Sequence, residues 1–200
     1  MSLLEVRDLK TYFHTKEGIV KAVDGVSFTL EEGEAIALVG ESGCGKTTTA
    51  LSITKLLPNE GKLAGGNVFF NGNDLVKLSH EKMRRTRWND ISIVFQGAMN
   101  SLNPVMKVGD QIIEAIMLHK GSNRTEAKKK VKELFELVEI NSERMDQFPH
   151  EFSGGMKQRA MIAMALACDP KLIIGDEPTT ALDVMVHAKF LICSKSLGKN

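Results

Sequence analysis

The stretch AIALVGESGCGKT, residues 35–47, constrains the fold of this chain more than any other part of the sequence. Residues 35–39 are all apolar, which is typical of a strand buried on both faces of a sheet. Residues 40–47 fit the pattern G-x-x-x-x-G-K-[ST], and a helix is predicted from residue 46 to about residue 57, before Pro58. This order of strand, glycine-rich turn and helix predicts an α/β fold with a phosphate-binding loop.

The residue types in this loop suit the binding of a nucleotide. Glycines let consecutive backbone N–H groups point at phosphate oxygens, and the helix N-terminus adds a partial positive charge. Lys46 is expected to reach the β- and γ-phosphates, and the Thr47 hydroxyl is expected to bind Mg²⁺. A glycine-rich turn without a ligand is the alternative, which the flanking strand and helix patterns disfavour. The predicted nucleotide contacts here are Gly40, Glu41, Ser42, Gly43, Cys44, Gly45, Lys46, Thr47 and Thr48.

A pair of adjacent acids provides the second half of the predicted site. Asp176 and Glu177 follow the apolar run LII and a glycine. Asp176 is placed to hold Mg²⁺, and Glu177 is placed to orient and deprotonate an attacking water molecule. Adjacent carboxylates are common on protein surfaces, but their position after an apolar strand in a chain with a phosphate-binding loop favours the catalytic interpretation.

Apolar patterning divides the rest of the chain into strand-rich and helical parts. Alternation predicts antiparallel strands at the start, an Asn-Gly turn follows a further strand, and Ser153 is a good helix N-cap. The expected strands cover residues 4–9, 20–30, 67–75, 91–96 and 171–175, and further helices cover residues 111–119, 125–138 and 152–168. A helical lobe inserted between strand-rich segments gives a division into residues 1–97, 98–152 and 153–200.

Composition excludes several classes of function. The net charge of +1, from 26 basic and 25 acidic residues, gives no overall attraction to nucleic acid or anionic lipid. The lysine run at 128–130 is interpreted as a solvated helix face. No apolar run approaches the ~18 residues of a membrane span, no signal peptide is visible, and the three cysteines share no metal-binding spacing. These features predict a cytosolic location.

The segment EFSGGMKQR, residues 151–159, resembles the L-S-G-G-Q signature of ATP-binding cassette (ABC) proteins. Gln96, after the strand ISIVF, resembles the Q-loop of that family, and ALD, residues 181–183, resembles its D-loop. The family stacks adenine on an aromatic residue near the N-terminus, for which Phe13 or Tyr12 is available; the register with Leu9 favours Phe13. The resemblance covers about residues 3–188.

This resemblance implies a P-loop NTPase core with a mixed sheet, an N-terminal antiparallel β subdomain and an inserted helical lobe. It also implies that two such domains pair head to tail and bind ATP between the P-loop of one and the signature of the other. The roles that follow are catalysis by Glu177, Lys46 and Gln96, and metal binding by Thr47, Gln96 and Asp176. The further nucleotide contacts are Gln96, Ser153, Gly154, Gly155 and Asp183.

Finer features are similar to the branch of importers for dipeptides, oligopeptides and nickel. These are YFHTKEGIVKAVDGVSF, VFQGAMNSLNPVMKVGDQI and Met156 in place of the signature glutamine. The resemblance implies an ATPase that powers peptide import from the cytoplasmic face of the plasma membrane, with nickel as the alternative cargo. The implied partners are two membrane permease subunits, a second ATP-binding subunit that is identical or different, and indirectly an extracytoplasmic substrate-binding protein, with no nucleic acid.

The last residues differ from the family pattern, in which a helix, a buried strand and a histidine follow the D-loop. Here VMVHAKFLI passes into CSKSLGKN, and His187 lies too soon after Asp183 to be that histidine. The expectation from this ending is that the C-terminal part of the core is missing through truncation or a frameshift. A nucleotide-binding fragment without transport activity is therefore an open alternative. A soluble cassette ATPase of DNA repair or translation is disfavoured because the lobe is short.

Overall fold

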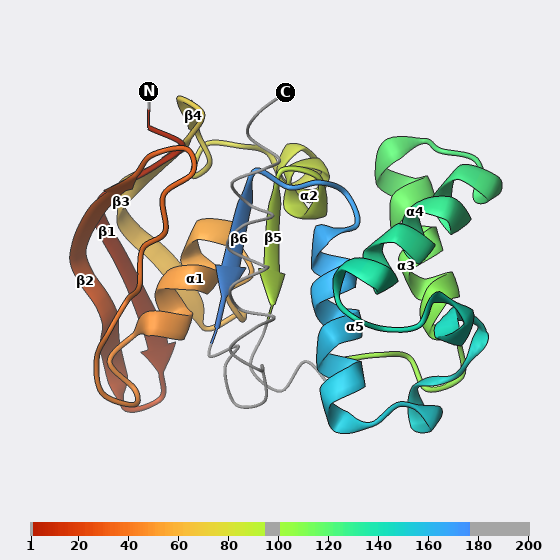
Figure 1. Cartoon of the computed structure of the whole chain (residues 1–200). Helices are drawn as coiled ribbons and strands as arrows, with labels where there is room; N and C mark the ends of the chain where they lie inside the picture. Colours follow the sequence, from red (N-terminus) through yellow and green to blue (C-terminus); the bar gives the residue numbers. More distant parts are fainter. Residues whose placement is uncertain (1, 95–100, 177–200) are drawn as a thin grey trace. The chain divides into compact units, whose positions relative to one another are not determined.

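The computed structural model describes residues 2–94 and 101–176. The chain divides into two compact units, Met1–Arg84 and Arg85–Asn200, which are described separately. Figure 1 shows the elements of both units. Within the described ranges, none of the helices has the length and apolar character needed to cross a membrane.

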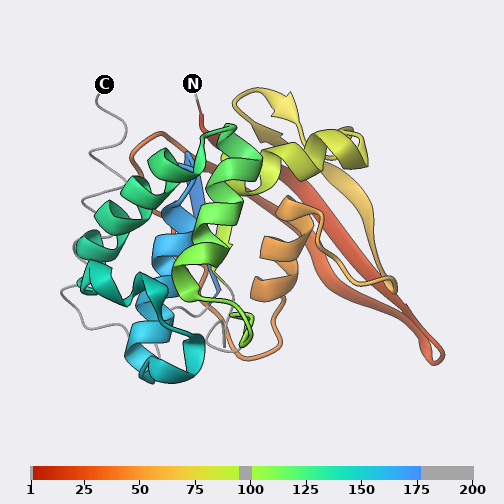
Figure 2. The ribbon, with the colours of Figure 1, turned by 90° about the vertical axis from the view of Figure 1, so that its right-hand side faces the viewer.

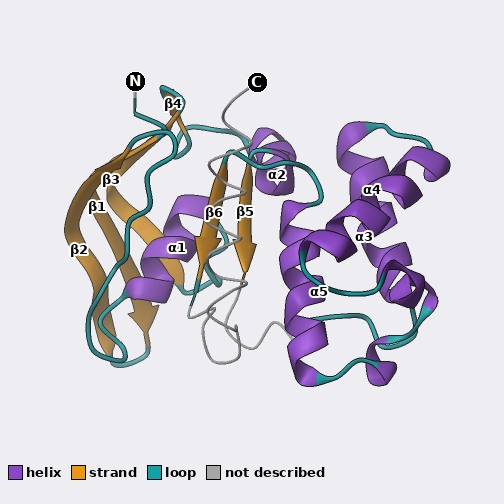
Figure 3. Ribbon diagram, in the orientation of Figure 1, coloured by secondary structure: helices purple, strands orange, loops and turns teal. Residues whose placement is uncertain are grey.

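The first unit is built on a four-stranded antiparallel sheet, drawn in orange in Figure 3. The strands β1 (Leu4–Thr15), β2 (Gly18–Leu30), β3 (Gly61–Phe70) and β4 (Asn73–Asp74) lie in the order β2-β1-β3-β4. The turn between β3 and β4 has φ values of 47° at Asn71 and 75° at Gly72, as the Asn-Gly pair predicts. The predicted N-terminal antiparallel strands are confirmed.

One face of β1 packs against α1 (Lys46–Thr54). Leu4, Val6 and Leu9 on β1 are buried, and register shifts after Val6 and Leu9 keep the buried side chains together. The buried hydroxyls of Thr11 and Ser52 are hydrogen-bonded at 2.7 Å and join the strand to the helix. This packing fixes the helix that begins at the phosphate-binding motif.

Lys55 ends α1 three residues before Pro58, and so earlier than predicted. It adopts a left-handed conformation with φ 52° and ψ 43°, and its amide donates to carbonyls of the last helical turn. Its ammonium donates to the carbonyls of Val76 and Leu78 at 3.0 and 2.9 Å. The helix therefore stops through a C-cap held by a distant loop, and not through the proline.

Residues 35–40 form no regular element, so the strand predicted there is wrong for this structure. The side chains of Ile36, Leu38 and Val39 are 43%, 43% and 93% exposed. A parallel-sheet strand needs a hydrogen-bonded neighbour for its amides, and none of the strands in the described residues pairs with this segment. Apolar composition alone therefore does not produce a strand here.

The second unit contains a two-stranded parallel sheet. Strand β5 (Ile91–Val94) pairs with β6 (Leu172–Gly175), with Ile91 opposite Leu172. Both strands were predicted, although β6 is only partly buried in the structure. The helix α2 (His80–Asn89) was not predicted; it crosses the border between the units and is kinked at Arg87 and Trp88.

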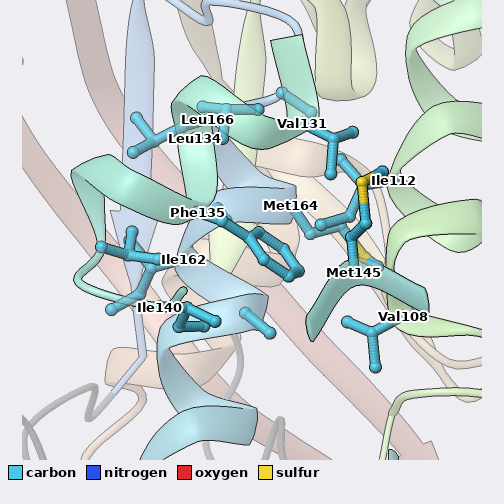
Figure 4. Close-up of a cluster of buried hydrophobic side chains, with 14 of the residues drawn as sticks. Val108, Ile112, Val131, Leu134, Phe135, Ile140, Met145, Ile162, Met164 and Leu166 are labelled. Carbon is cyan, nitrogen blue, oxygen red and sulfur yellow. The ribbon is translucent and has the colours of Figure 1, made fainter. Parts of the chain in front are cut away.

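The helical lobe of the second unit packs around a single apolar cluster, which includes Phe135, Ile112 and Met164 (Figure 4). Its long helices are in contact with one another, and Figure 2 shows them side by side. They include the predicted helix 111–119, extended at both ends, and the predicted helix 125–138, shifted by one residue toward the N-terminus. The elements are α3 (Val108–Lys120), α4 (Arg124–Leu137), η2 (Ser142–Asp146), η3 (Pro149–Glu151) and α5 (Gly154–Leu166). The division at residues 97/98 and 152/153 stays a prediction.

Candidate nucleotide-binding site

The phosphate-binding motif folds into a curled loop in front of α1. Gly43 and Gly45 have φ values of 82° and 93°, which reverse the chain before the helix. The Lys46 ammonium turns back and donates to the carbonyls of Gly40 and Glu41, at 2.7 Å each. The lysine therefore lies over the loop, where a cation is needed to contact bound phosphates.

The N-terminus of α1 has no side-chain cap. Its N-cap is Gly45, which has no side chain to cap the first amides, and the first turn contains no acidic residue. Thr47 is exposed and Thr48 is half-buried. The lack of a side-chain cap and the helix dipole together favour a phosphate group at this position.

Replacing Gly45 with alanine is expected to destabilise the fold. A Cβ at this position would lie 2.3 Å from the carbonyl oxygen of Ala22, in a backbone conformation with φ 93°. The left-handed strain costs about 1–2 kcal/mol, and the displacement of a backbone carbonyl adds to it. Urea unfolding should show a loss above about 2 kcal/mol. In the control, Gly43→Ala, the Cβ meets no atom within 4 Å, so equal losses in both variants would contradict the steric argument.

Cys44 and Cys168 provide a chemical test of this loop. Cys44 is exposed, with its sulfur 3.5 Å from Lys46 Nζ. Cys168 is buried, and burial raises the pKa of its thiol. A smaller fraction of this thiol is therefore present as the reactive thiolate. Iodoacetamide should therefore alkylate Cys44 and spare Cys168. Saturating Mg-ATP should slow the reaction at Cys44 about tenfold, since bound phosphates cover the loop.

Peptide mapping by mass spectrometry reports each cysteine separately, and urea-unfolded chain, in which both thiols should react, is the control. An unchanged rate at Cys44 with ATP present would mean that nucleotide does not cover the loop.

The two candidate adenine-stacking residues make different contacts. The Tyr12 hydroxyl donates to Asp24 at 2.6 Å, which lowers the pKa of Asp24 and raises that of Tyr12, and Lys21 lies 5.4 Å from the Tyr12 ring centroid. The Phe13 ring packs over Gly61, where an added Cβ would lie 3.0 Å from it. Both rings thus have a packed neighbour, and the choice of Phe13 for adenine stacking stays a prediction.

In the second unit, the predicted signature forms the N-terminus of α5. The Ser153 hydroxyl accepts a hydrogen bond from the Met156 amide at 3.3 Å, which confirms the predicted N-cap. Gly154 and Gly155 are exposed, no acidic residue lies in the first turn, and a Cβ at Gly155 would meet no atom within 4 Å. This end of α5 presents backbone amides to solvent, as binding of a phosphate from a second molecule requires.

Arg159 supports this helix terminus and was given no role in the sequence analysis. Its guanidinium donates to the backbone carbonyl of Glu139 at 3.3 Å and to its carboxylate at 3.4 Å. Glu139 has a φ of 59°, at the turn that follows α4. The signal in the sequence was the arginine inside the signature-like stretch, but its partner could not be identified without the fold.

Of the remaining predicted residues, Asp176 is within the described part of the chain. Asp176 is buried, with 8% exposure, and its amide donates to the Val94 carbonyl at 2.9 Å, directly after the β5–β6 ladder. Gln96, Glu177 and Asp183 lie outside the described residues. The structure thus brings the loop residues together in the first unit, and it places Ser153, Gly154, Gly155 and Asp176 in the second.

Comparison with known proteins identifies the family. The model of the family described as "ABC transporter" matches residues 23–180, which include both the loop and the signature. The chain belongs to the ABC transporter family. Membership accounts for the amide-lined termini of α1 and α5 in one chain.

Among curated ABC proteins, the chain is 52% identical over 192 residues to the "Probable peptide ABC transporter ATP-binding protein y4tR" of Sinorhizobium fredii, covering 94% of this chain and 57% of that protein. It is also 52% identical over 200 residues to the "Oligopeptide transport ATP-binding protein OppD" of Bacillus subtilis, covering 98% of this chain and 56% of that protein. The chain thus spans somewhat more than half the length of these relatives.

Solved ABC structures confirm the fold class. The "Dimeric Structure of MJ0796, a Bacterial ABC Transporter Cassette" matches with a TM-score of 0.85 at 26% identity, over 98% of this chain and 84% of that chain. A post-hydrolysis state of the same cassette, bound to ADP and Pi, matches with a TM-score of 0.84 at 27% identity, over 98% of this chain and 83% of that chain.

Proposed function

We propose that this chain is the ATP-binding and ATP-hydrolysing part of a membrane importer for dipeptides or oligopeptides. The observation that carries the proposal is the loop before α1, where the Lys46 ammonium lies over two backbone carbonyls beside a helix N-terminus that has no side-chain cap. This arrangement suits the β- and γ-phosphates of a nucleotide. Its relatives are named as peptide and oligopeptide transport ATP-binding proteins, which supports the choice of cargo over nickel.

In this proposal, two cassettes form a dimer that binds each ATP between the loop of one and the signature of the other. Lys46 and the loop amides hold the phosphates from one side, and Ser153, Gly154 and Gly155 donate to the γ-phosphate from the other. Phe13 stacks on the adenine. Glu177 acts as the general base, while Gln96 and Asp183 complete the nucleotide contacts.

Mg²⁺ is implied by the family, and the donor set fits it. The Thr47 hydroxyl and the Asp176 carboxylate are oxygen ligands of the kind that Mg²⁺ prefers, and Gln96 is a third oxygen donor. The described residues contain no cluster of three or more histidine, cysteine, aspartate or glutamate side chains suited to a metal. Thr47, Gln96 and Asp176 would hold a magnesium ion, which would neutralise charge on the phosphates.

The proposed partners are two permease subunits, a second ATP-binding subunit, and indirectly an extracytoplasmic substrate-binding protein. The proposed location is the cytoplasmic face of the plasma membrane. The naming of the relatives as transport proteins supports both points.

Co-purification with two permease subunits and peptide-stimulated ATP hydrolysis test this function. The complex should hydrolyse Mg-ATP faster when a substrate-binding protein loaded with peptide is added. Stimulation by nickel and not by peptide would mean that the cargo is nickel. A chain that binds ATP but neither hydrolyses it nor retains permease subunits would instead be a nucleotide-binding fragment without a transport role.

A further inference from the structure

Trp88, the single tryptophan of the chain, adopts a backbone conformation that is unfavourable for a bulky residue. Its φ is 71° and its ψ is −38°, and it follows Arg87 at the kink that ends α2, three residues before β5. Positive φ at a large side chain persists only where surrounding contacts maintain it. The contacts of the Trp88 side chain therefore indicate which interactions maintain this strained conformation.

Those contacts reach two helices of the lobe. The indole Nε1–H donates to the carbonyl of Met164, in the last turn of α5, at 2.8 Å. The indole ring lies 5.9 Å from the ring of His119, near the end of α3, and the half-buried side chain packs against the lobe core. One residue thus joins the entry of β5 to both α5 and α3.

The same turn also anchors the other strand of the sheet. The carbonyl of Asp90 accepts hydrogen bonds from the amides of Lys171 and Leu172, at 2.9 and 3.1 Å, where β6 begins. The backbone around Trp88 therefore holds β6, which leads to Asp176, while its side chain holds α5, whose other end carries Ser153 and its amides.

We propose that Trp88 is a positioning residue that fixes the signature end of α5 relative to the β5–β6 sheet. This inference rests on the proposed function. The Trp88 contacts described above are with α5, α3 and the lobe core, so we expect its loss to leave ATP affinity at the loop intact. It should slow hydrolysis, because in the proposed dimer the signature of one chain must meet the ATP held by the other chain in a fixed position.

Kinetics of the complete permease complex test this role. Trp88→Phe keeps an aromatic ring and removes the N–H, and Trp88→Gly also removes the ring but suits the positive φ. Both should bind a fluorescent ATP analogue within about twofold of wild type and lower kcat about tenfold, with the larger loss in Trp88→Gly. Trp88→Phe, which retains a ring against the lobe core, guards against failure to fold. Lys129→Ala, on the exposed face of α4, is the matched control.

A spectroscopic measurement tests the contact itself. A ¹⁵N-labelled chain should give one indole N–H signal, which exchanges slowly with solvent because Met164 accepts the proton. Unchanged kcat in both variants, or an indole proton that exchanges like free tryptophan, would overturn the proposal for Trp88 alone. Equal losses of affinity and kcat would also overturn it in favour of a general structural role. A wild-type complex that hydrolyses no ATP would overturn both this proposal and the proposed function.

Discussion

Replacing Lys46 with alanine is expected to lower the affinity for ATP about a hundredfold and to lower hydrolysis further. The ammonium can exchange its two loop carbonyls for phosphate oxygens, and charge-assisted hydrogen bonds of this kind contribute about 1.5–3 kcal/mol each. Losing about 3 kcal/mol corresponds to about a hundredfold in the dissociation constant. Titration with a fluorescent ATP analogue and a phosphate-release assay measure the two effects.

This substitution should leave the fold intact. Among the described residues, the side chain of Lys46 donates within the loop itself, to the carbonyls of Gly40 and Glu41 and toward the sulfur of Cys44. The free energy of unfolding in urea should therefore change by less than about 1 kcal/mol. Lys129→Ala removes the same charge from the surface of α4 and should retain full affinity. Normal ATP binding by the Lys46 variant would exclude the proposed site.

The second large effect is expected from Gly155→Asp. A Cβ at this position meets no atom within 4 Å, and a carboxylate in the first turn of α5 interacts favourably with the helix dipole, by about 0.3–1 kcal/mol. The variant should therefore be as stable as wild type or slightly more so. If the signature receives a γ-phosphate, the same carboxylate repels it by up to about 4 kcal/mol at 4 Å and an effective dielectric of 20.

Hydrolysis should fall at least a hundredfold in Gly155→Asp, while ATP binding at the loop of the isolated chain stays normal. Gly155→Ala is the matched control, because it adds the Cβ without the charge and should lose much less activity. Unfolding curves of the three proteins show whether stability is involved. An aspartate variant with normal turnover would mean that this end of α5 does not meet the phosphate.

Sequence patterns over a few neighbouring residues predicted the elements whose formation depends on those residues. The alternation in β1 and β2 predicted their pairing, Asn71-Gly72 predicted the turn before β4, and Ser153 predicted the start of α5. The turn and the helix start depend on residues close in sequence, and the strands depend on apolar side chains at every second position. The family resemblance added the fold class, which the solved cassettes confirm.

Other features depend on distant partners and could not be predicted in this way. Residues 35–40 have the composition of a buried strand, but a strand also needs a neighbour. The early end of α1 depends on carbonyls that accept from Lys55 more than 20 residues away in sequence. The conformation of Trp88 depends on Met164, and the helix α2 carries few apolar residues to indicate it.

The same held for the site. The motif predicted which residues form the loop, and the structure confirms its curled backbone and the end of α1 that has no side-chain cap. The motif did not predict that the Lys46 ammonium would be held by loop carbonyls. Side-chain positions depend on which acceptors lie within reach, and that follows from the fold.

The exposed segment 35–39 has a consequence for the loop that it precedes. Its apolar side chains are exposed and none of the strands in the described residues pairs with it, so a strand added there would restrict the backbone that leads into Gly40. An ordered entry lowers the conformational entropy that the loop loses when it closes on a phosphate. Strand pairing and nucleotide binding are therefore thermodynamically linked, and each strengthens the other by the same factor.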